Sequence, residues 1–198
     1  MQELALLMEG GCVDARDEEF ARLVKQAKAG DAVAFEAILG LYERRVLLTA
    51  LRLLNRNIED AKDAAQQVFL RLHRSLGRLD ENRHFASWLY RVTVNVCRDM
   101  LRARAHRPAL SLEDAGAGLV PAAADDPVRN EQRRLIYAAL ATLPERERTA
   151  VVLRDLEGFT TSEAARIMGC SEVTVRSQIS NARVKSRKFV RRPPRRPL

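Results

Sequence analysis

Apolar residues recur three or four positions apart along most of this chain, a spacing typical of helices with one buried face. The spacing predicts helices over residues 17–29, 32–54, 61–76, 85–107, 135–143, 145–156, 161–168 and 172–185. Residues 1–16 show no clear amphipathic period and are expected to form an N-terminal extension. The predicted fold class is therefore all-α.

Glycine and polar residues separate these helices at positions where a helix start or stop is expected. Gly30 ends the first helix, and Asp31 is a good N-cap for the second. Residues 55–57 break the second helix, and Glu59 or Asp60 opens the third. These signals agree with the boundaries that the apolar spacing predicts.

The segment 108–130 differs in composition from the helices on either side. It holds three prolines, two glycines and several alanines, and its charged residues give a net charge of −3. Residues 17–107 carry a net charge of +5 and residues 131–190 one of +4, with a basic tail over residues 191–198. Since loops much longer than about 15 residues are uncommon inside compact domains, two small helical domains joined by a flexible linker are expected. One domain with a long loop is the alternative.

The helix expected over residues 85–107 begins with aromatic residues and ends with arginines, and a polar loop at residues 77–84 precedes it. One face carries the apolar residues Phe85, Leu89, Val92, Val96 and Met100. Trp88 lies beside this face, and Tyr90 lies on another side. The stretch contains five arginines and one aspartate, so it is strongly basic. Rings that stack on bases and guanidinium groups that hold phosphates suit a nucleic acid with separated strands. A core helix with a solvated basic side is the alternative.

The charge of the chain points to a polyanionic partner. The composition, 46% hydrophobic and 30% charged, is ordinary for a soluble globular protein, but the net charge is +8. Such a charge favours nucleic acid, with membrane lipid as the other candidate. No apolar run approaches the length of a membrane span, and the Leu-rich patch at residues 4–8 lacks the basic start of a signal peptide. A cytoplasmic protein without stable membrane insertion is expected.

Metal, cofactor and catalytic motifs are not found in the sequence. Cys12, Cys97 and Cys170 are widely spaced, with no Cys-x-x-Cys pair or His–Cys cluster, so free thiols in a reducing compartment are expected. The three histidines are scattered, and no phosphate-binding glycine loop is present. These observations predict a protein that is not an enzyme and needs no metal or cofactor.

The segment from Thr160 onward has the features of a helix-turn-helix. Thr160 and Glu163 have the spacing of a capping box. Ala165 is small enough to let two helices approach, Gly169 tolerates a left-handed turn, and Val175 anchors the second helix. That helix would present its exposed N-terminal half to a DNA major groove. Two ordinary packed helices are the alternative.

Both halves of the chain resemble one protein family. Leu-Pro-Glu-Arg-Glu-Arg at residues 143–148, Ser-Glu-Ala-Ala-Arg-Ile-Met-Gly at 162–169 and Thr-Val-Arg-Ser at 174–177 resemble region 4 of bacterial sigma factors. Residues 59–72 resemble region 2.2, and residues 85–99 resemble regions 2.3 and 2.4. No region 3 domain fits in the linker, and this two-domain plan resembles the extracytoplasmic-function (ECF) group of the sigma-70 family.

The resemblance implies a subunit that binds core RNA polymerase and directs promoter recognition, DNA opening and transcription initiation. Region 2.2 would dock on the β′ clamp helices through Asp60, Asp63, Gln66, Gln67 and Phe69. The −10 element would be held by Asn82, Arg83, Trp88, Tyr90, Arg91, Asn95, Arg98 and Arg102. The −35 element would be bound by Thr174, Arg176, Ser177, Gln178, Ser180, Asn181, Arg183 and Lys185. Region 4 would also contact the β flap, and an anti-sigma factor is a further expected partner.

Three positions depart from the family pattern. Gln67 stands where an acidic residue is usual, which makes the expected polymerase contact less charged. Gln178 and Asn181 replace two cations of the recognition helix, and Asn and Gln favour adenine edges where Arg favours guanine. A stand-alone helix-turn-helix regulator is the alternative function. It would explain residues 131–190 but not the aromatic and basic helix over residues 85–107.

Overall fold

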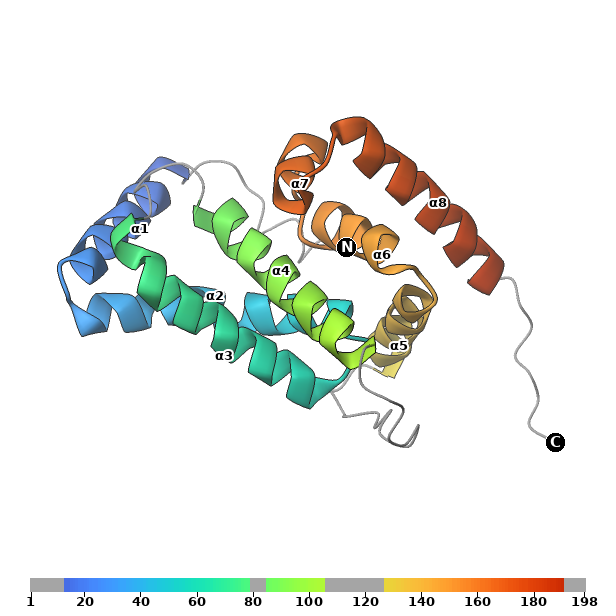
Figure 1. Ribbon diagram of the computed structural model, residues 1–198, viewed down its shortest axis with the longest axis horizontal. Coiled ribbons are helices and arrows are strands. Elements are labelled where there is room, and N and C mark those ends of the chain that lie inside the picture. Colours follow the sequence, from blue (N-terminus) through green and yellow to red (C-terminus); the bar gives the residue numbers. More distant parts are fainter. Residues whose placement is uncertain (1–12, 79–84, 106–126, 191–198) are drawn as a thin grey trace.

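The computed structural model describes residues 13–78, 85–105 and 127–190, and every regular element in these ranges is helical. The first part of the chain forms α1 (Val13–Lys28), α2 (Ala32–Leu53), α3 (Ile58–Ser75), the 3-10 helix η1 (Leu76–Arg78) and α4 (Phe85–Ala105). The second part forms α5 (Pro127–Ala141), α6 (Glu145–Val151), the π-helix η2 (Val152–Leu156), α7 (Thr161–Met168) and α8 (Glu172–Val190). We call α1–α4 lobe 1 and α5–α8 lobe 2; the two lie side by side along the long axis (Figure 1). The expected all-α fold of two helical units is confirmed.

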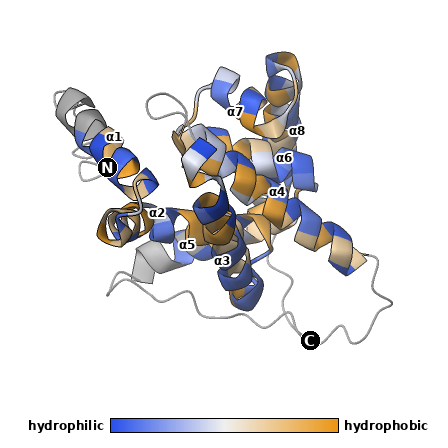
Figure 2. Cartoon of the chain, turned by 60° about the vertical axis from the view of Figure 1, so that its left-hand side comes forward, coloured by the Kyte–Doolittle hydropathy of each residue, from blue (hydrophilic) through white to orange (hydrophobic). Residues whose placement is uncertain are grey.

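Lobe 1 is a helical bundle in which α2, α3 and α4 pack against one another (Figure 1). Its most deeply buried side chains come from all three helices and include Ile38, Leu51, Val68, Leu72, Leu89 and Val96. Each of these side chains contributes about 1.5–3 kcal/mol by leaving water. Each helix therefore combines a hydrophobic face with a hydrophilic one, as the mixed colouring in Figure 2 shows.

Side-chain caps set the starts of α2 and α3. Asp31 Oδ1 accepts hydrogen bonds from two N–H groups in the first turn of α2, at 2.9 and 3.2 Å, and Gly30 before it has a φ of 95°. The cap of α3 is Asn57, whose Oδ1 accepts from the N–H of Asp60 at 3.0 Å. The expected cap at Asp31 is confirmed, whereas the expected start at Glu59 or Asp60 is wrong. The helix begins directly after Asn57 because the side chain of Asn57 accepts a hydrogen bond from an N–H group that has no partner within the helix.

Two predicted helix starts shift toward the N-terminus, the first by four residues and the second by eight. The first helix begins at Val13, so the end of the expected N-terminal extension is helical. The fifth begins at Pro127, inside the expected linker, because proline is well tolerated at the first helical position. The rest of that linker, residues 108–126, lies outside the described residues, as do residues 1–12, 79–84, 106–107 and the tail at 191–198.

Lobe 2 packs α6, α7 and α8 around a small core, with α5 against α8. Leu140, Leu143, Val152, Leu153 and Val175 are all buried in it. After α6 the backbone widens into η2, which ends where the N–H of Glu157 donates to the carbonyl of Val152 at 2.9 Å. Gly158 then turns the chain with a φ of 79°. The wide turn places Glu157 beside lobe 1, where its carboxylate accepts hydrogen bonds from the hydroxyl groups of Thr49 and Tyr90.

The two lobes contact each other in this structure. In Figure 1 α4 runs close to α7. The helix α2 also contacts α6 and η2. The sequence predicted two domains joined by a flexible linker, and in the structure their described parts touch through polar side chains and through the ring pair of Tyr90 and Phe159. Charged and hydroxyl groups spread along α2 and α4 make this possible, because they find partners on lobe 2.

Candidate nucleic-acid interface

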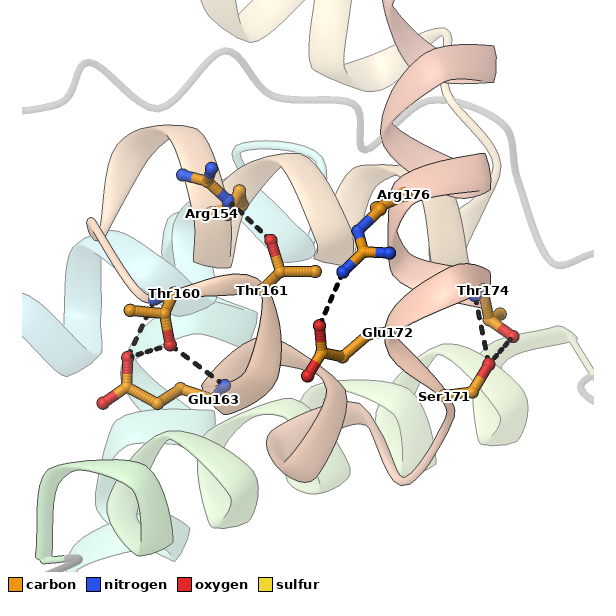
Figure 3. A network of polar contacts seen from close by, with 8 residues as sticks. All are labelled: Arg154, Thr160, Thr161, Glu163, Ser171, Glu172, Thr174 and Arg176. Atoms are coloured by element: carbon orange, nitrogen blue, oxygen red, sulfur yellow. Dashed lines mark hydrogen bonds and ion pairs between the residues drawn. The ribbon is translucent and has the colours of Figure 1, made fainter.

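The helix α7 begins with the predicted capping box, which Figure 3 shows. The Thr160 hydroxyl oxygen accepts from the N–H of Glu163 at 3.2 Å. The Glu163 carboxylate in turn accepts from the N–H of Thr160 at 2.8 Å and from its hydroxyl at 2.7 Å. Two N–H groups that a helix start leaves free are thereby paired. The box is confirmed, and it determines the residue at which the helix-turn-helix begins.

The turn between α7 and α8 has the geometry that the sequence predicted. Gly169 is left-handed, with φ 64° and ψ 43°, and its N–H donates to the carbonyl of Ala165. A side chain at this position would cost about 1–2 kcal/mol. Ser171 Oγ accepts from the N–H of Thr174 at 3.2 Å and starts α8 (Figure 3). Ala165 and Val175 are both buried, so the two helices pack closely, as expected.

The face of α8 opposite this core is open. Of the residues expected to bind the −35 element, Arg176, Ser177, Ser180, Asn181, Arg183 and Lys185 are exposed, and Thr174 and Gln178 are half-buried. Arg176 pairs with Glu172 at 2.7 Å, and Arg183 lies 3.4 Å from Asp155. Both pairs are exposed on the arginine side, and such pairs contribute only about 0–1 kcal/mol. A phosphate can therefore replace the carboxylate at low cost.

Lys185 differs from the other candidates on α8. Its ammonium group lies 2.7 Å from Glu147, whose side chain is only 9% exposed. The pair closes α8 onto α6 within lobe 2. Lys185 therefore has a structural partner that a DNA phosphate would have to displace, at a higher cost than for Arg176.

The surface beside α8 is hollowed into a basic groove of about 330 Å³. Four arginines and two hydroxyl residues line it: Arg154, Arg176, Arg183, Arg187, Thr161 and Ser180. Arg154 comes from η2 and donates to Thr161 Oγ1 at 3.2 Å, and Figure 3 shows Thr161 between Arg154 and Arg176. We call this hollow the arginine groove. Closely spaced guanidinium groups with hydroxyl donors are suited to binding a phosphate backbone.

Three residues of the arginine groove, Arg154, Thr161 and Arg187, were missed by the sequence analysis. Arg187 lies four residues after Arg183 and eleven after Arg176, so the helical period alone could have placed it on the same face. Arg154 gave no such signal, because it comes from another element. Only the packing of η2 beside α7 and α8 brings it into the groove.

The predicted −10 residues on α4 are less exposed than the predicted −35 residues on α8. Trp88 is half-buried, with its ring centroid 6.5 Å from that of Phe85. Tyr90 is only 3% exposed. Its hydroxyl donates to Glu157 of lobe 2 at 2.6 Å, and its ring packs edge-on against Phe159 at 4.8 Å. Tyr90 was expected on a side of the helix other than the apolar face, and in the structure lobe 2 covers that side.

Burial has a direct effect on the Tyr90 phenol. Removal from water is the main cause that raises its pKa above the ordinary value of about 10, and the hydrogen bond to the Glu157 carboxylate raises it further. The phenol is therefore a permanent hydrogen-bond donor at neutral pH. It holds the carboxylate of the other lobe and offers no free ring for stacking in this conformation.

The arginines of α4 also reach toward lobe 2. Arg98 Nε donates to Glu145 at 3.0 Å, and Arg91 donates to the backbone carbonyl of Arg166 at 2.6 Å. Asn95 is half-buried and Arg102 is exposed. The remaining two candidates for the −10 element, Asn82 and Arg83, lie outside the described residues. The structure thus gathers Tyr90, Arg91 and Arg98 at one contact between the lobes.

Three of the residues expected to bind polymerase form one exposed patch on α3. Asp63, Gln66 and Gln67 are exposed and are spaced three and four apart, so their side chains are neighbours. Phe69 is half-buried, and Asp60 pairs with Arg104 at 3.0 Å. Leu70 belongs to the same surface: it lies seven residues after Asp63 and is 50% exposed. We call Asp63, Gln66, Gln67 and Leu70 the α3 face. The sequence analysis missed Leu70, although its spacing could have indicated it.

Other chemistry is limited in the part of the chain that the structure describes. No cluster of His, Cys, Asp or Glu there could hold a metal ion. Cys97 is buried, and burial raises the pKa of its thiol to about 12, so it packs as a small apolar side chain. None of the described helices is both long and apolar enough to span a bilayer.

A helix-turn-helix with an exposed basic recognition helix defines a DNA-binding protein, and the comparisons with known proteins state which kind. Residues 38–107 match Sigma-70 region 2, and residues 133–185 match Sigma-70 region 4. The chain is 36% identical over 165 residues to the ECF RNA polymerase sigma factor SigM of Mycobacterium tuberculosis, covering 83% of this chain and 81% of the relative. It is 32% identical over 176 residues to the RNA polymerase sigma-H factor of Pseudomonas aeruginosa, covering 84% and 91%. The protein belongs to the ECF group of the sigma-70 family and is an alternative sigma factor.

Solved structures agree with this assignment. The structure of CnrH in complex with the cytosolic domain of CnrY matches with a TM-score of 0.64 and 26% identity, over 86% of this chain and 96% of that one. The sigma factor RpoE of Bartonella quintana, solved with the anti-sigma factor NepR, matches with a TM-score of 0.61 over 79% and 96%. Its identity is 19%, so that likeness concerns the fold.

Proposed function

We propose that lobe 2 binds the −35 element through α8 and the arginine groove. The observation that carries this proposal is the open basic face of α8 beside a hollow lined by four arginines. A helix of this kind enters a major groove with its N-terminal half, while arginines beside it hold the phosphates. Gln178 and Asn181 lie on this helix, and such side chains pair with adenine edges.

Lobe 1 has the other two roles in this proposal. The α3 face holds the polymerase, because Asp63, Gln66, Gln67 and Leu70 are exposed and lie next to one another on the helix. The segment before α4 and the N-terminal end of α4 take the strand-separated −10 element. Trp88, half-buried at this end, supports that role.

The proposal extends to partners, catalysis and location. The chain acts through the active site of the polymerase and has none of its own, and it works in the cytoplasm, where polymerase and promoter DNA are. CnrH has been solved in complex with the cytosolic domain of CnrY, and this supports an anti-sigma partner for the present chain as well. A stand-alone regulator is not supported, because residues 38–107 match the sigma-70 region 2 family.

Transcription with purified components tests the proposal. Core RNA polymerase with this chain should select one class of promoter from a pool of randomised duplex DNA and start transcripts on it. An Arg176→Ala variant should lose selection at the −35 position, whereas Arg74→Ala, an exposed arginine of α3, should retain it. Failure of the wild-type chain to support any promoter-specific transcript would overturn the proposed function.

A further inference from the structure

A row of uncharged side chains runs along the middle of the exposed face of α8. Val173, Ser177, Ser180 and Val184 are spaced four, three and four residues apart, so they lie above one another on the helix. All four are exposed, and the buried residues of α8 lie on the opposite side of the helix. We call these four residues the neutral row.

Arginines flank the neutral row on one side. Arg176, Arg183 and Arg187 are spaced seven and four residues apart, so they follow a line parallel to the row, and all three line the arginine groove. Ser180 and Val184 of the neutral row line the same groove. Because arginines bind phosphates and base edges are read by hydrogen bonds and apolar contacts, this division suits a helix that turns its neutral row toward the bases.

The first turn of α8 exposes one apolar side chain. Glu172 pairs with Arg176 at 2.7 Å, and the hydroxyl oxygens of Ser171 and Thr174 lie 2.9 Å apart (Figure 3). Val173 is 70% exposed and is not one of the side chains that pack against the core. At an exposed position, a branched side chain stabilises a helix less than alanine does. The fold therefore does not explain a valine at this position.

The chemistry of a valine side chain favours one of the four bases in a major groove. Its two methyl groups neither donate nor accept a hydrogen bond, so they gain nothing from the N7, O6 and amino groups of the other bases. The C5-methyl group of thymine is the apolar group at a base edge there, and contact with it removes apolar surface from water. Residues at the N-terminal end of a recognition helix contact base edges, and Val173 is the second residue of α8.

We propose that Val173 contacts the C5-methyl group of a thymine in the −35 element and makes that position selective for thymine. The proposal rests on the proposed function of lobe 2. It adds a residue that precedes the Thr-Val-Arg-Ser motif and that the sequence analysis did not include. DNA is the partner that fits this face, because the arginines beside the neutral row attract a polyanion.

Removal of a single methyl group tests this contact. Core RNA polymerase with this chain first selects its preferred promoter from randomised duplex DNA. Each thymine of the −35 element, on either strand, is then replaced in turn by deoxyuridine, which pairs as thymine does and lacks only the C5-methyl group. Competition binding with the holoenzyme should show one replacement that weakens binding by about three- to fivefold, the effect of one buried methyl group.

Variants at residue 173 assign this effect to its side chain. Val173→Ala should bind the thymine and deoxyuridine duplexes equally, whereas Val173→Ile, which keeps a branched apolar side chain, should retain the preference for thymine. Val33 is the matched control, because it is the second residue of α2 and is 76% exposed, so Val33→Ala should behave as the wild type does. A thermal melt by circular dichroism checks that each variant folds.

Two results would overturn the contact and leave −35 recognition by lobe 2 intact. One is equal binding of the thymine and deoxyuridine duplexes by the wild-type holoenzyme at every position. The other is a preference for thymine that remains unchanged in Val173→Ala. If the wild-type holoenzyme selected no sequence at the −35 position, the proposed function would fail, and the contact of Val173 would fail with it.

Discussion

The helices α4 and α8 look alike in sequence and differ in what covers them. Each buries an apolar face and carries arginines and polar residues on the other side. On α8 that side is open, with Arg176 and Arg183 in weak surface pairs. On α4 it is partly covered, with Tyr90 buried and Arg98 held by lobe 2, while Arg91, Arg102 and Arg104 are exposed.

The difference shows that a basic helix face is a DNA site only in a conformation that leaves it uncovered. The same arginine can hold a phosphate or a carboxylate of its own chain, with similar geometry. In this structure the residues of α8 that are proposed to bind DNA are mostly exposed, whereas Tyr90 and Arg98 of α4 contact lobe 2. The following predictions test this difference.

The largest effect is expected where the two helices are the same, in their buried faces. Leu89 on α4 is fully buried, so Leu89→Ala should cost about 2–5 kcal/mol and unfold lobe 1. Leu135 on α5 is 51% exposed, and Leu135→Ala should change the free energy of unfolding by less than about 0.5 kcal/mol. Urea denaturation followed by circular dichroism measures both. Equal costs would contradict the packing described for α4.

The open side of α8 should respond directly to loss of a cation. Arg176→Ala should weaken binding of the free protein to −35 duplex DNA by about 1–3 kcal/mol, with little change in stability, because its pair with Glu172 is exposed. Lys185→Ala should weaken binding less, since Lys185 is paired with the largely buried Glu147. Fluorescence anisotropy at several salt concentrations measures both. A larger loss for Lys185→Ala would reverse the ranking of these two cations.

The closed side of α4 should respond to alkaline pH. The folded-state pKa of Tyr90 is raised, so its stabilising effect is complete below the unfolded value of about 10 and is lost as the pH rises beyond it. Near-ultraviolet absorbance should show a late-ionising tyrosine in the wild-type chain that Tyr90→Phe lacks. Tyr137→Phe, which changes a half-buried tyrosine of α5, should retain it. If Tyr137→Phe lost the late-ionising component, that component would belong to Tyr137, and the prediction for Tyr90 would be wrong.

A small effect on stability is expected at Trp88, which packs beside Phe85 at the end of α4 that is proposed to bind the −10 element. Trp88 is half-buried, so Trp88→Phe should cost less than about 1.5 kcal/mol. Promoter opening by the holoenzyme, followed by permanganate reactivity of thymines near the start site, should nevertheless fall. Tyr137→Phe serves as the aromatic control in lobe 2. If the Trp88→Phe holoenzyme opened the promoter fully, Trp88 would have a structural role and no role in promoter opening.

Local signals in the sequence predicted local structure well. The cap at Asp31, the box at Thr160 and Glu163 and the left-handed turn at Gly169 were all expected and are all present. Each depends on contacts within three or four residues, which a sequence displays directly. The cap at Asn57 was missed because several polar residues compete near that boundary, and only the backbone geometry decides among them.

The sequence by itself determined that this protein is a sigma factor of the ECF group, with two helical units and a helix-turn-helix, because period, caps and motif order are written along the chain. Tertiary structure alone decided which basic surfaces are open. Thr49, Tyr90 and Glu157 are separated by up to 108 positions, and no local pattern shows that they meet. Arg154 joins the arginine groove in the same way, through packing of distant segments. Long-range polar contacts have no period in sequence, since each depends on where two whole helices come to lie.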